Sequence, residues 1–237
     1  MCTANAIRSP FLEHLLRARL SGTGLTPPVI ESAGSAARPG RPAEPRIVEI
    51  ARAYGLDLDG HRTRRLDEHV LASSAPVLCA AAIHRRAVLD MRPDLLDATF
   101  TVREFSRLLS EQVDPVGERG DWGALARAAA RHRSSPRRGA RGDDDLVDPI
   151  AQPAEVWAEF ERHAVEAVDR IVHHAVRLLG PNGSASRIDQ PPRTRREWRA
   201  ARALLDSPQT ERERPPFSGG ACAFGEDVAR PKVPPRR

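Results

Sequence analysis

Two features are missing from this chain, and each absence narrows what the protein can be. Its three cysteines in 237 residues lack the paired spacing of a disulfide framework. No apolar run approaches the roughly 20 residues that a membrane-spanning helix needs, and no signal-like leader opens the sequence. We therefore predict a cytoplasmic protein in a reducing compartment, without a membrane interaction.

Aromatic side chains are scarce, at 4% of the chain, whereas 36 of the 237 residues are arginine. The formal net charge of +5 equals the excess of basic over acidic side chains in residues 181–237, where there are 12 basic and seven acidic side chains. The same segment contains nine prolines. That composition is typical of disorder, so we predict a folded domain at residues 1–179 and a disordered tail at 180–237. A solvated tail is favoured over one that binds acidic partners, and we expect no specific nucleic-acid binding.

Short apolar or β-branched runs alternate with helical patterns within residues 1–179. The runs are Pro28–Ile30, Pro76–Cys79 and Ala98–Val102, and the helical patterns are Phe11–Leu20, Arg46–Tyr54, Arg85–Leu89 and Pro153–Leu179. This alternation predicts an α/β fold with a parallel sheet between helices. Residues 111–147 are interpreted as an insertion, with a helix around Trp122–His132 and a flexible loop after it.

A cysteine and an arginine stand six residues apart at the start of the chain, at Cys2 and Arg8. Backbone N–H groups curling into a helix N-terminus bind anions, and a guanidinium grips phosphate through two parallel hydrogen bonds. In such a field a thiol pKa is lowered and the thiolate becomes a nucleophile. In a chain this rich in arginine the spacing alone is weak evidence, so the residues between the two decide its interpretation.

Those residues suit one tight loop that enters a helix. Thr3 and Ala4 are small, and Asn5 tolerates unusual backbone angles. Ser9 is predicted to cap the helix, with Pro10 at its first position. The loop residues alone leave open an ordinary N-terminal helix with an idle Cys2.

The string from Cys2 to Pro10 resembles the phosphate-binding loop of low-molecular-weight protein tyrosine phosphatases, with Ile7 in place of a second cysteine. Further segments resemble that family in the same order. Val29–Gly34 resembles the second strand and its serine turn, Gly40–Pro45 resembles the loop that opens the next helix, and Tyr54–Arg64 resembles a segment that ends in a histidine and basic residues. Asp94–Leu109 resembles a strand and helix typical of bacterial members, and Asp145–Ile150 resembles the loop that carries the general acid. The resemblance covers about residues 1–179 and implies a three-layer α/β/α fold around a doubly wound, four-stranded parallel sheet.

The same resemblance implies a phosphomonoester hydrolase that acts through a phosphocysteine intermediate. Cys2 would attack phosphorus, Arg8 would hold the phosphoryl oxygens, and Asp148 would act as general acid and then as base. The phosphate-binding loop would comprise Thr3, Ala4, Asn5, Ala6, Ile7 and Ser9, with Ser32 and His61 supporting its shape. The resemblance also implies that the Ser9 hydroxyl donates to the Cys2 thiolate. Asp114, before Pro115, is the less favoured acid, because Asp148 directly precedes the last helix.

Phosphotyrosine proteins are the default substrates that the resemblance implies. Family members that favour aryl phosphates line the cleft with aromatic residues, whereas the corresponding neighbourhoods here hold Ala36, Ala37, Arg38 and Ile150. A small or acidic phosphomonoester is therefore the alternative substrate. No metal or organic cofactor is implied, since the adjacent His173 and His174 point about 100° apart on a helix.

One departure from the family precedes the nucleophile, where members have a hydrophobic strand and this chain has only Met1. We expect either a longer native product that begins upstream or an impaired one. The competing function is a phosphatase-like module that binds phosphorylated ligands without turnover, or an interaction protein. Thioredoxin-coupled arsenate reductases are excluded because they need a further cysteine pair. Cys79 is interpreted as a small buried hydrophobe.

Overall fold

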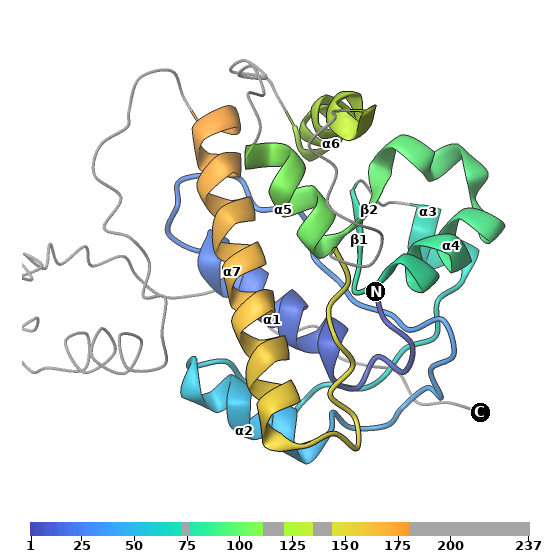
Figure 1. Cartoon of the computed structure of the whole chain (residues 1–237), viewed down its shortest axis with the longest axis vertical. Coiled ribbons are helices and arrows are strands. Elements are labelled where there is room, and N and C mark those ends of the chain that lie inside the picture. Colours follow the sequence, from blue (N-terminus) through green and yellow to red (C-terminus); the bar gives the residue numbers. More distant parts are fainter. Residues whose placement is uncertain (73–75, 111–120, 135–143, 181–237) are drawn as a thin grey trace, which may run out of the picture.

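The computed structural model describes residues 1–72, 76–110, 121–134 and 144–180. Its elements (Figure 1) are α1 (Arg8–Leu20), α2 (Pro45–Ala53), α3 (Glu68–Ala72), β1 (Val77–Cys79), α4 (Ala82–Met91), the 3-10 helix η1 (Pro93–Ala98), β2 (Thr99–Thr101), α5 (Val102–Ser110), α6 (Trp122–Arg131), the 3-10 helix η2 (His132–Ser134) and α7 (Ala154–Leu179). The predicted tail, most of the predicted flexible loop and the rival acid Asp114 lie outside these ranges.

The sheet is parallel, as predicted, but its regular part is short. Strands β1 and β2 pair from Val77 with Thr99 to Cys79 with Thr101. The other side of β1 pairs with the first residue of the chain: the Met1 ammonium donates to the Leu78 carbonyl at 2.6 Å, and the Ala80 N–H donates to the Met1 carbonyl at 2.8 Å. Met1 and Cys2 therefore occupy the place of a strand beside β1.

A second short pairing lies on the other side of Cys2. Cys2 and Gly34 form a parallel bridge, and Gly34 forms another with Arg65. Of the four strands expected, two are regular in the part of the chain described and two are reduced to these bridges. The spatial order is Gly34, Cys2, β1, β2, so the candidate nucleophile stands in the middle of the sheet.

The strand predicted at Pro28–Ile30 is wrong. No strand is assigned there, and the Val29 side chain is 91% exposed. Pro27 and Pro28 have no N–H group to donate to a neighbouring strand. Pairing in this part of the chain is therefore delayed until Gly34.

Helices cover both faces of the sheet, with α1, α5 and α7 packed together on one face and α4 against the other (Figure 1). The larger hydrophobic cluster lies on the α7 side, and a smaller one, which includes Ala33, Val77 and Cys79, lies on the opposite side. The helix predicted at Pro153–Leu179 is confirmed as α7, whose buried face includes Phe160, Ala164, Val168, Ile171 and Ala175. None of the described helices is both long and apolar enough to cross a bilayer.

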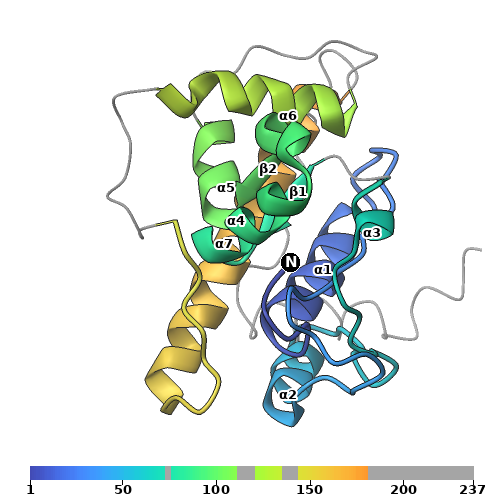
Figure 2. The same cartoon turned by 90° about the vertical axis from the view of Figure 1, so that its right-hand side faces the viewer.

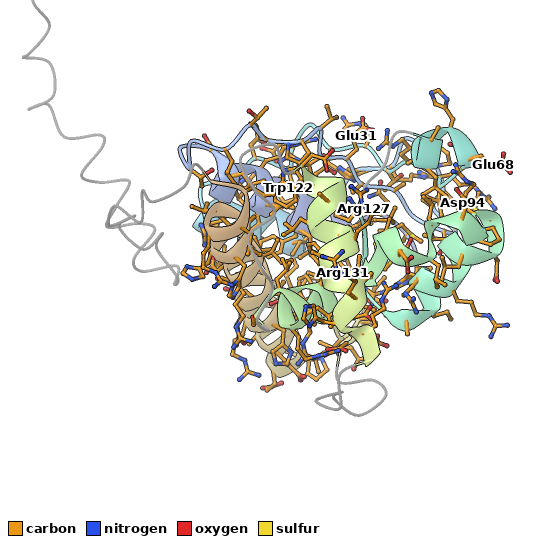
Figure 3. All side chains as sticks on the ribbon, turned by 90° about the horizontal axis from the view of Figure 1, so that it is seen from above. Glu31, Glu68, Asp94, Trp122, Arg127 and Arg131 are labelled. Atoms are coloured by element: carbon orange, nitrogen blue, oxygen red, sulfur yellow. The ribbon has the colours of Figure 1, made fainter. Side chains whose placement is uncertain are left out.

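The helix predicted in the insertion is confirmed as α6, which lies beside α5 at one end of the molecule (Figure 2). The Asp121 carboxylate caps it by accepting from the Ala124 N–H at 2.7 Å. Trp122 is buried at its start, whereas Arg127 and Arg131 are exposed along it (Figure 3). One apolar face thus attaches α6 to the rest of the domain.

An apolar groove of about 400 Å³ opens beside Met1. It is bordered by residues 28–32 on one side and by Pro76 and Leu78 on the other, and α1, α5, α6 and α7 contribute Leu12, Leu16, Val102, Trp122, Val168 and Ile171. The candidate catalytic residues Cys2, Arg8 and Asp148 are not among its lining residues.

Candidate active site

The candidate nucleophile lies where its short pairing segment ends and a loop leads into α1. The Cys2 side chain is buried, with 3% of the residue exposed. Residues 3–7 form the loop, and α1 starts at Arg8. The loop therefore lies at the carboxyl edge of a parallel sheet and before a helix N-terminus, where unpaired N–H groups favour an anion.

The predicted role of Ser9 as helix cap is wrong. The N-cap position is Ile7, which makes no side-chain cap, and Ser9 lies within the first turn. Pro10 can stand in this turn because the first four N–H groups of a helix have no intrahelical acceptor. The Ser9 hydroxyl lies 3.0 Å from the Cys2 sulfur, in the place that the resemblance implied for it.

Asn5 is the centre of a buried hydrogen-bond network that holds the loop. It is fully buried and has a left-handed backbone with φ of 55°, which asparagine tolerates better than most residues. Its Nδ2 donates to the hydroxyls of Ser9 at 3.0 Å and Ser32 at 2.8 Å. Its Oδ1 accepts from the Arg64 N–H at 2.8 Å, and His61 Nε2 lies 2.7 Å from its carbonyl oxygen. The structure thus brings the loop residues Asn5 and Ser9 together with both predicted supporting residues, Ser32 and His61.

The remaining loop residues act through backbone contacts and packing. The Ala6 carbonyl accepts from the Glu44 N–H at 3.0 Å, and the Ile7 side chain is buried in the larger core. Ala4 is exposed. Of the predicted cleft walls, Ala36 is exposed and donates its N–H to the Thr3 carbonyl at 2.9 Å, whereas Ala37 is 1% exposed and contributes little surface.

Gly34 has no side chain, and this allows the backbone of the loop at Thr3 and Asn5 to lie close to it. A Cβ at Gly34 would stand 2.4 Å from the Thr3 carbonyl oxygen and 2.8 Å from the Asn5 nitrogen, both backbone atoms. Gly34→Ala is therefore expected to cost about 2 kcal/mol or more of unfolding free energy and to lower turnover. Urea unfolding and a phosphatase assay measure both effects.

Gly60→Ala is the matched control, because a Cβ there meets nothing within 4 Å. Gly60→Ala should change neither the unfolding free energy nor turnover. Equal stability of the two variants would contradict the proposed close approach at Gly34.

Arg8 joins the phosphate-loop side of the site to the predicted acid. Its guanidinium is buried, with 5% of the residue exposed. Nη1 donates to the Leu146 carbonyl at 3.2 Å, and Nη2 donates to Asp148 Oδ2 at 2.5 Å. The Asp148 side chain is 43% exposed. Folding thus brings Arg8 and Asp148 into contact although they are far apart in the sequence.

The segment before Asp148 is fastened to the carboxyl edge of the sheet. The Leu146 N–H donates to the Ala80 carbonyl at 2.8 Å, just after β1. Asp145 Oδ1 accepts from the Ala82 N–H at 2.7 Å. The preceding Asp144 pairs with Arg107 of α5 at 2.7 Å. The sequence analysis missed these anchors, because they join residues whose spacing carries no signal.

His84 is the main side chain at the site that the sequence analysis missed. Its Nε2 lies 2.8 Å from Thr3 Oγ1. Burial, together with the positive charges of Arg8 and the Met1 ammonium, lowers the pKa of His84 to about 4. Since the fold holds this imidazole neutral, its contribution to stability is present above pH 6.5 and is lost as the pH falls towards 4.

Cys79, the second described cysteine, is a buried core residue and not part of the candidate site. It is fully buried in β1, and burial raises the pKa of its thiol to about 11. Its prediction as a small buried hydrophobe is confirmed.

Comparisons with known proteins agree on one family. The family model of low molecular weight phosphotyrosine protein phosphatase matches residues 1–115. Over 134 residues the chain is 28% identical to the low molecular weight protein-tyrosine-phosphatase Etp of Escherichia coli K12, covering 54% of this chain and 86% of Etp. The chain is therefore similar, over its N-terminal half, to the low-molecular-weight phosphotyrosine protein phosphatases.

Solved structures support the fold. The low molecular weight protein tyrosine phosphatase of T. tengcongensis aligns with a TM-score of 0.53 and 27% identity, covering 73% of this chain and 94% of that one. The YwlE arginine phosphatase of Geobacillus stearothermophilus aligns with a TM-score of 0.53 over 73% of this chain and 87% of its own, and at 22% identity it shows the fold alone. The predicted α/β fold class is therefore confirmed.

Proposed function

We propose that this chain hydrolyses phosphomonoesters by way of a phosphocysteine intermediate, with phosphotyrosine proteins as its first substrate class. The observation that carries the proposal is the contact of Arg8 Nη2 with Asp148 Oδ2 at 2.5 Å, beside the loop that begins at Cys2. A nucleophile, a phosphate-binding cation and an acid thus meet at one edge of the sheet. The similarity of residues 1–115 to the phosphatase family model supports this assignment.

In the first step the Cys2 sulfur attacks phosphorus and forms a sulfur–phosphorus bond while the bond to the leaving oxygen breaks. The Ser9 hydroxyl, 3.0 Å from the sulfur, stabilises the thiolate by donating to it. Arg8 and the loop N–H groups hold the phosphoryl oxygens through the transition state. Asp148 transfers its proton to the leaving oxygen.

In the second step Asp148, now ionised, takes a proton from water as that water attacks phosphorus. The sulfur–phosphorus bond breaks, inorganic phosphate leaves, and the Cys2 thiolate is restored. Asp148 must move between these tasks, and its half-exposed side chain allows this. A phosphate that binds the Arg8 guanidinium competes with the Asp148 carboxylate for Nη2, so substrate itself would release the acid from the ion pair.

The surroundings of the loop bear on the choice of substrate. Ala36, Arg38 and Ile150 are exposed and none is aromatic, so the walls supply no ring to stack on tyrosine. We therefore keep a small or acidic phosphomonoester as the second candidate. Comparing kcat/KM for phosphotyrosine peptides, rich or poor in acidic residues, with that for small phosphomonoesters would decide between these classes.

Hydrolysis of p-nitrophenyl phosphate by the purified chain tests the proposal directly. We expect turnover together with a transient phosphoenzyme, which rapid acid quenching and mass analysis of the peptide containing Cys2 would detect. Binding of inorganic phosphate without any turnover would overturn the enzymatic proposal and favour a phosphate-binding module.

Replacing the acid gives a more specific prediction. Asp148→Asn should lower kcat about 10²-fold to 10⁴-fold on phenyl phosphate, whose leaving oxygen needs a proton. The loss should be smaller on p-nitrophenyl phosphate, since nitrophenolate leaves without full protonation. Steady-state kinetics on both esters measures the difference.

Asp90→Asn is the control for this substitution, because Asp90 is an exposed carboxylate of α4 whose nearest cation, Arg86, is 4.0 Å away. It should leave both rates unchanged. If Asp148→Asn kept full turnover on phenyl phosphate while Asp114→Asn lost it, the role of acid would pass to Asp114.

A further inference from the structure

His84 lies outside the proposed chemical steps but contacts the loop that performs them. It belongs to the first full turn of α4, and 3% of the residue is exposed. Its Nε2 lies 2.8 Å from the hydroxyl of Thr3, the residue that follows the nucleophile. In the part of the chain that the structure describes, its buried Nδ1 has no hydrogen-bond partner. A buried imidazole therefore has one polar contact, and that contact is with the phosphate loop.

The beginning of α4 also holds the loop of the acid. The Ala82 N–H donates to Asp145 Oδ1 at 2.7 Å, and the Ala80 carbonyl accepts from the Leu146 N–H at 2.8 Å. One short segment, residues 80–84, thus contacts the nucleophile side of the site through Thr3 and the acid side through Asp145 and Leu146. The distance between the two sides depends on both attachments.

We propose that His84 is a positioning residue for the reaction, which holds the phosphate loop against the same turn of α4 that anchors the acid loop. This inference rests on the proposed function and deepens it. Through the Thr3 hydroxyl, His84 fixes the place of the sulfur relative to the Asp148 carboxyl. Both must reach opposite sides of one phosphorus atom, so a small displacement lowers the rate.

The charges around His84 require a neutral imidazole. Burial is the main factor that opposes a positive charge there, Arg8 and the Met1 ammonium oppose it further, and Asp148 favours it. Of the two neutral tautomers, the one with a proton on Nε2 leaves only a lone pair of Nδ1 unpaired, which is less costly than an unpaired N–H. Nε2 then donates to the Thr3 hydroxyl, so a replacement must supply a donor at that place.

The test compares His84→Leu, which removes the donor, with His84→Gln, whose amide nitrogen can reach the position of Nε2. We expect His84→Leu to lower kcat about tenfold or more on phenyl phosphate and less on p-nitrophenyl phosphate, because a displaced acid matters most for a poor leaving group. His84→Gln should restore most of the loss. Thr3→Val, an isosteric change at an exposed residue, should reproduce the loss if His84→Leu fails to fold.

Two further variants separate positioning from general destabilisation. His174→Leu is the matched control, since burial also lowers the pKa of His174 to about 4, but it lies on α7 beside His173 and Arg177. It should leave both rates unchanged. The double variant Thr3→Val with His84→Leu should be no slower than His84→Leu alone, because both remove one interaction.

Three results would overturn the inference: full activity of His84→Leu, equal losses on the two esters, or losses that multiply in the double variant. Turnover by the wild-type chain distinguishes failure of the positioning role from failure of the proposed function. If the wild type turns over substrate and His84→Leu is equally active, only the positioning role is overturned. No turnover by the wild type overturns the proposed function, and the positioning role with it.

Discussion

Cys2→Ser is expected to abolish phosphatase turnover while leaving the fold intact. A serine hydroxyl is a far weaker nucleophile and leaving group than a thiolate, so kcat on p-nitrophenyl phosphate should fall about 10⁴-fold or more. The fold should persist because oxygen is smaller than sulfur and can keep the contact with the Ser9 hydroxyl, which lies 3.0 Å from Cys2 Sγ. Steady-state kinetics and thermal unfolding measure the two expectations.

Cys79→Ser is the matched control for the nucleophile. Cys79 is fully buried in β1, and burial raises its thiol pKa to about 11, so it is held as a neutral thiol. Placing a hydroxyl there should cost about 1–3 kcal/mol of unfolding free energy without lowering kcat of the folded fraction. Full turnover by Cys2→Ser would contradict the cysteine mechanism, whatever Cys79→Ser does.

Arg8→Lys is expected to lower kcat/KM about 10³-fold. The planar guanidinium reaches the Leu146 carbonyl through Nη1 and the Asp148 carboxylate through Nη2 at the same time. A lysine ammonium is a single point charge and cannot present two parallel donors to a phosphate. The same p-nitrophenyl phosphate assay, at several substrate concentrations, measures the loss.

Arg19→Lys provides the comparison within the same helix. Arg19 is also buried, with 3% of the residue exposed, and its Nε donates to Asp169 Oδ1 at 2.6 Å. This substitution should lower the midpoint of thermal unfolding but spare kcat/KM. Similar kinetic losses in the two variants would mean that Arg8 acts only by holding the fold together.

Local features of the fold could be predicted from the sequence because they depend on neighbouring residues. The stripe of α7 repeats with the period of a helix and ends at Gly180, where the helix ends in the structure. The α6 helix was predicted within one residue of its observed end. The strand predicted at Pro28–Ile30 failed because Pro27 and Pro28 withhold donors that the apolar run alone does not reveal.

Some features of the candidate site could likewise be predicted from neighbouring residues, whereas others required the folded chain. Cys2, Asn5, Arg8 and Ser9 lie within residues 2–9, so their spacing and residue types can be recognised in the sequence alone. The resemblance implied the contact of the Ser9 hydroxyl with the Cys2 sulfur, whereas the predicted cap failed because α1 begins at Arg8, one residue before Ser9. Asp148 could be placed only by its likeness to a family loop, and its contact with Arg8 required the folded chain.

The sequence by itself predicted the phosphate-binding loop and the helical periods and carried the resemblance to the family, since each depends on residues close together along the chain. Tertiary structure alone decided the pairing of Cys2 with Gly34, the anchoring of the acid loop by Asp144 and Asp145, and the contact of His84 with Thr3. These contacts join distant segments. Their partners are selected by how helices and strands pack around two cores, and sequence spacing contains no measure of that packing.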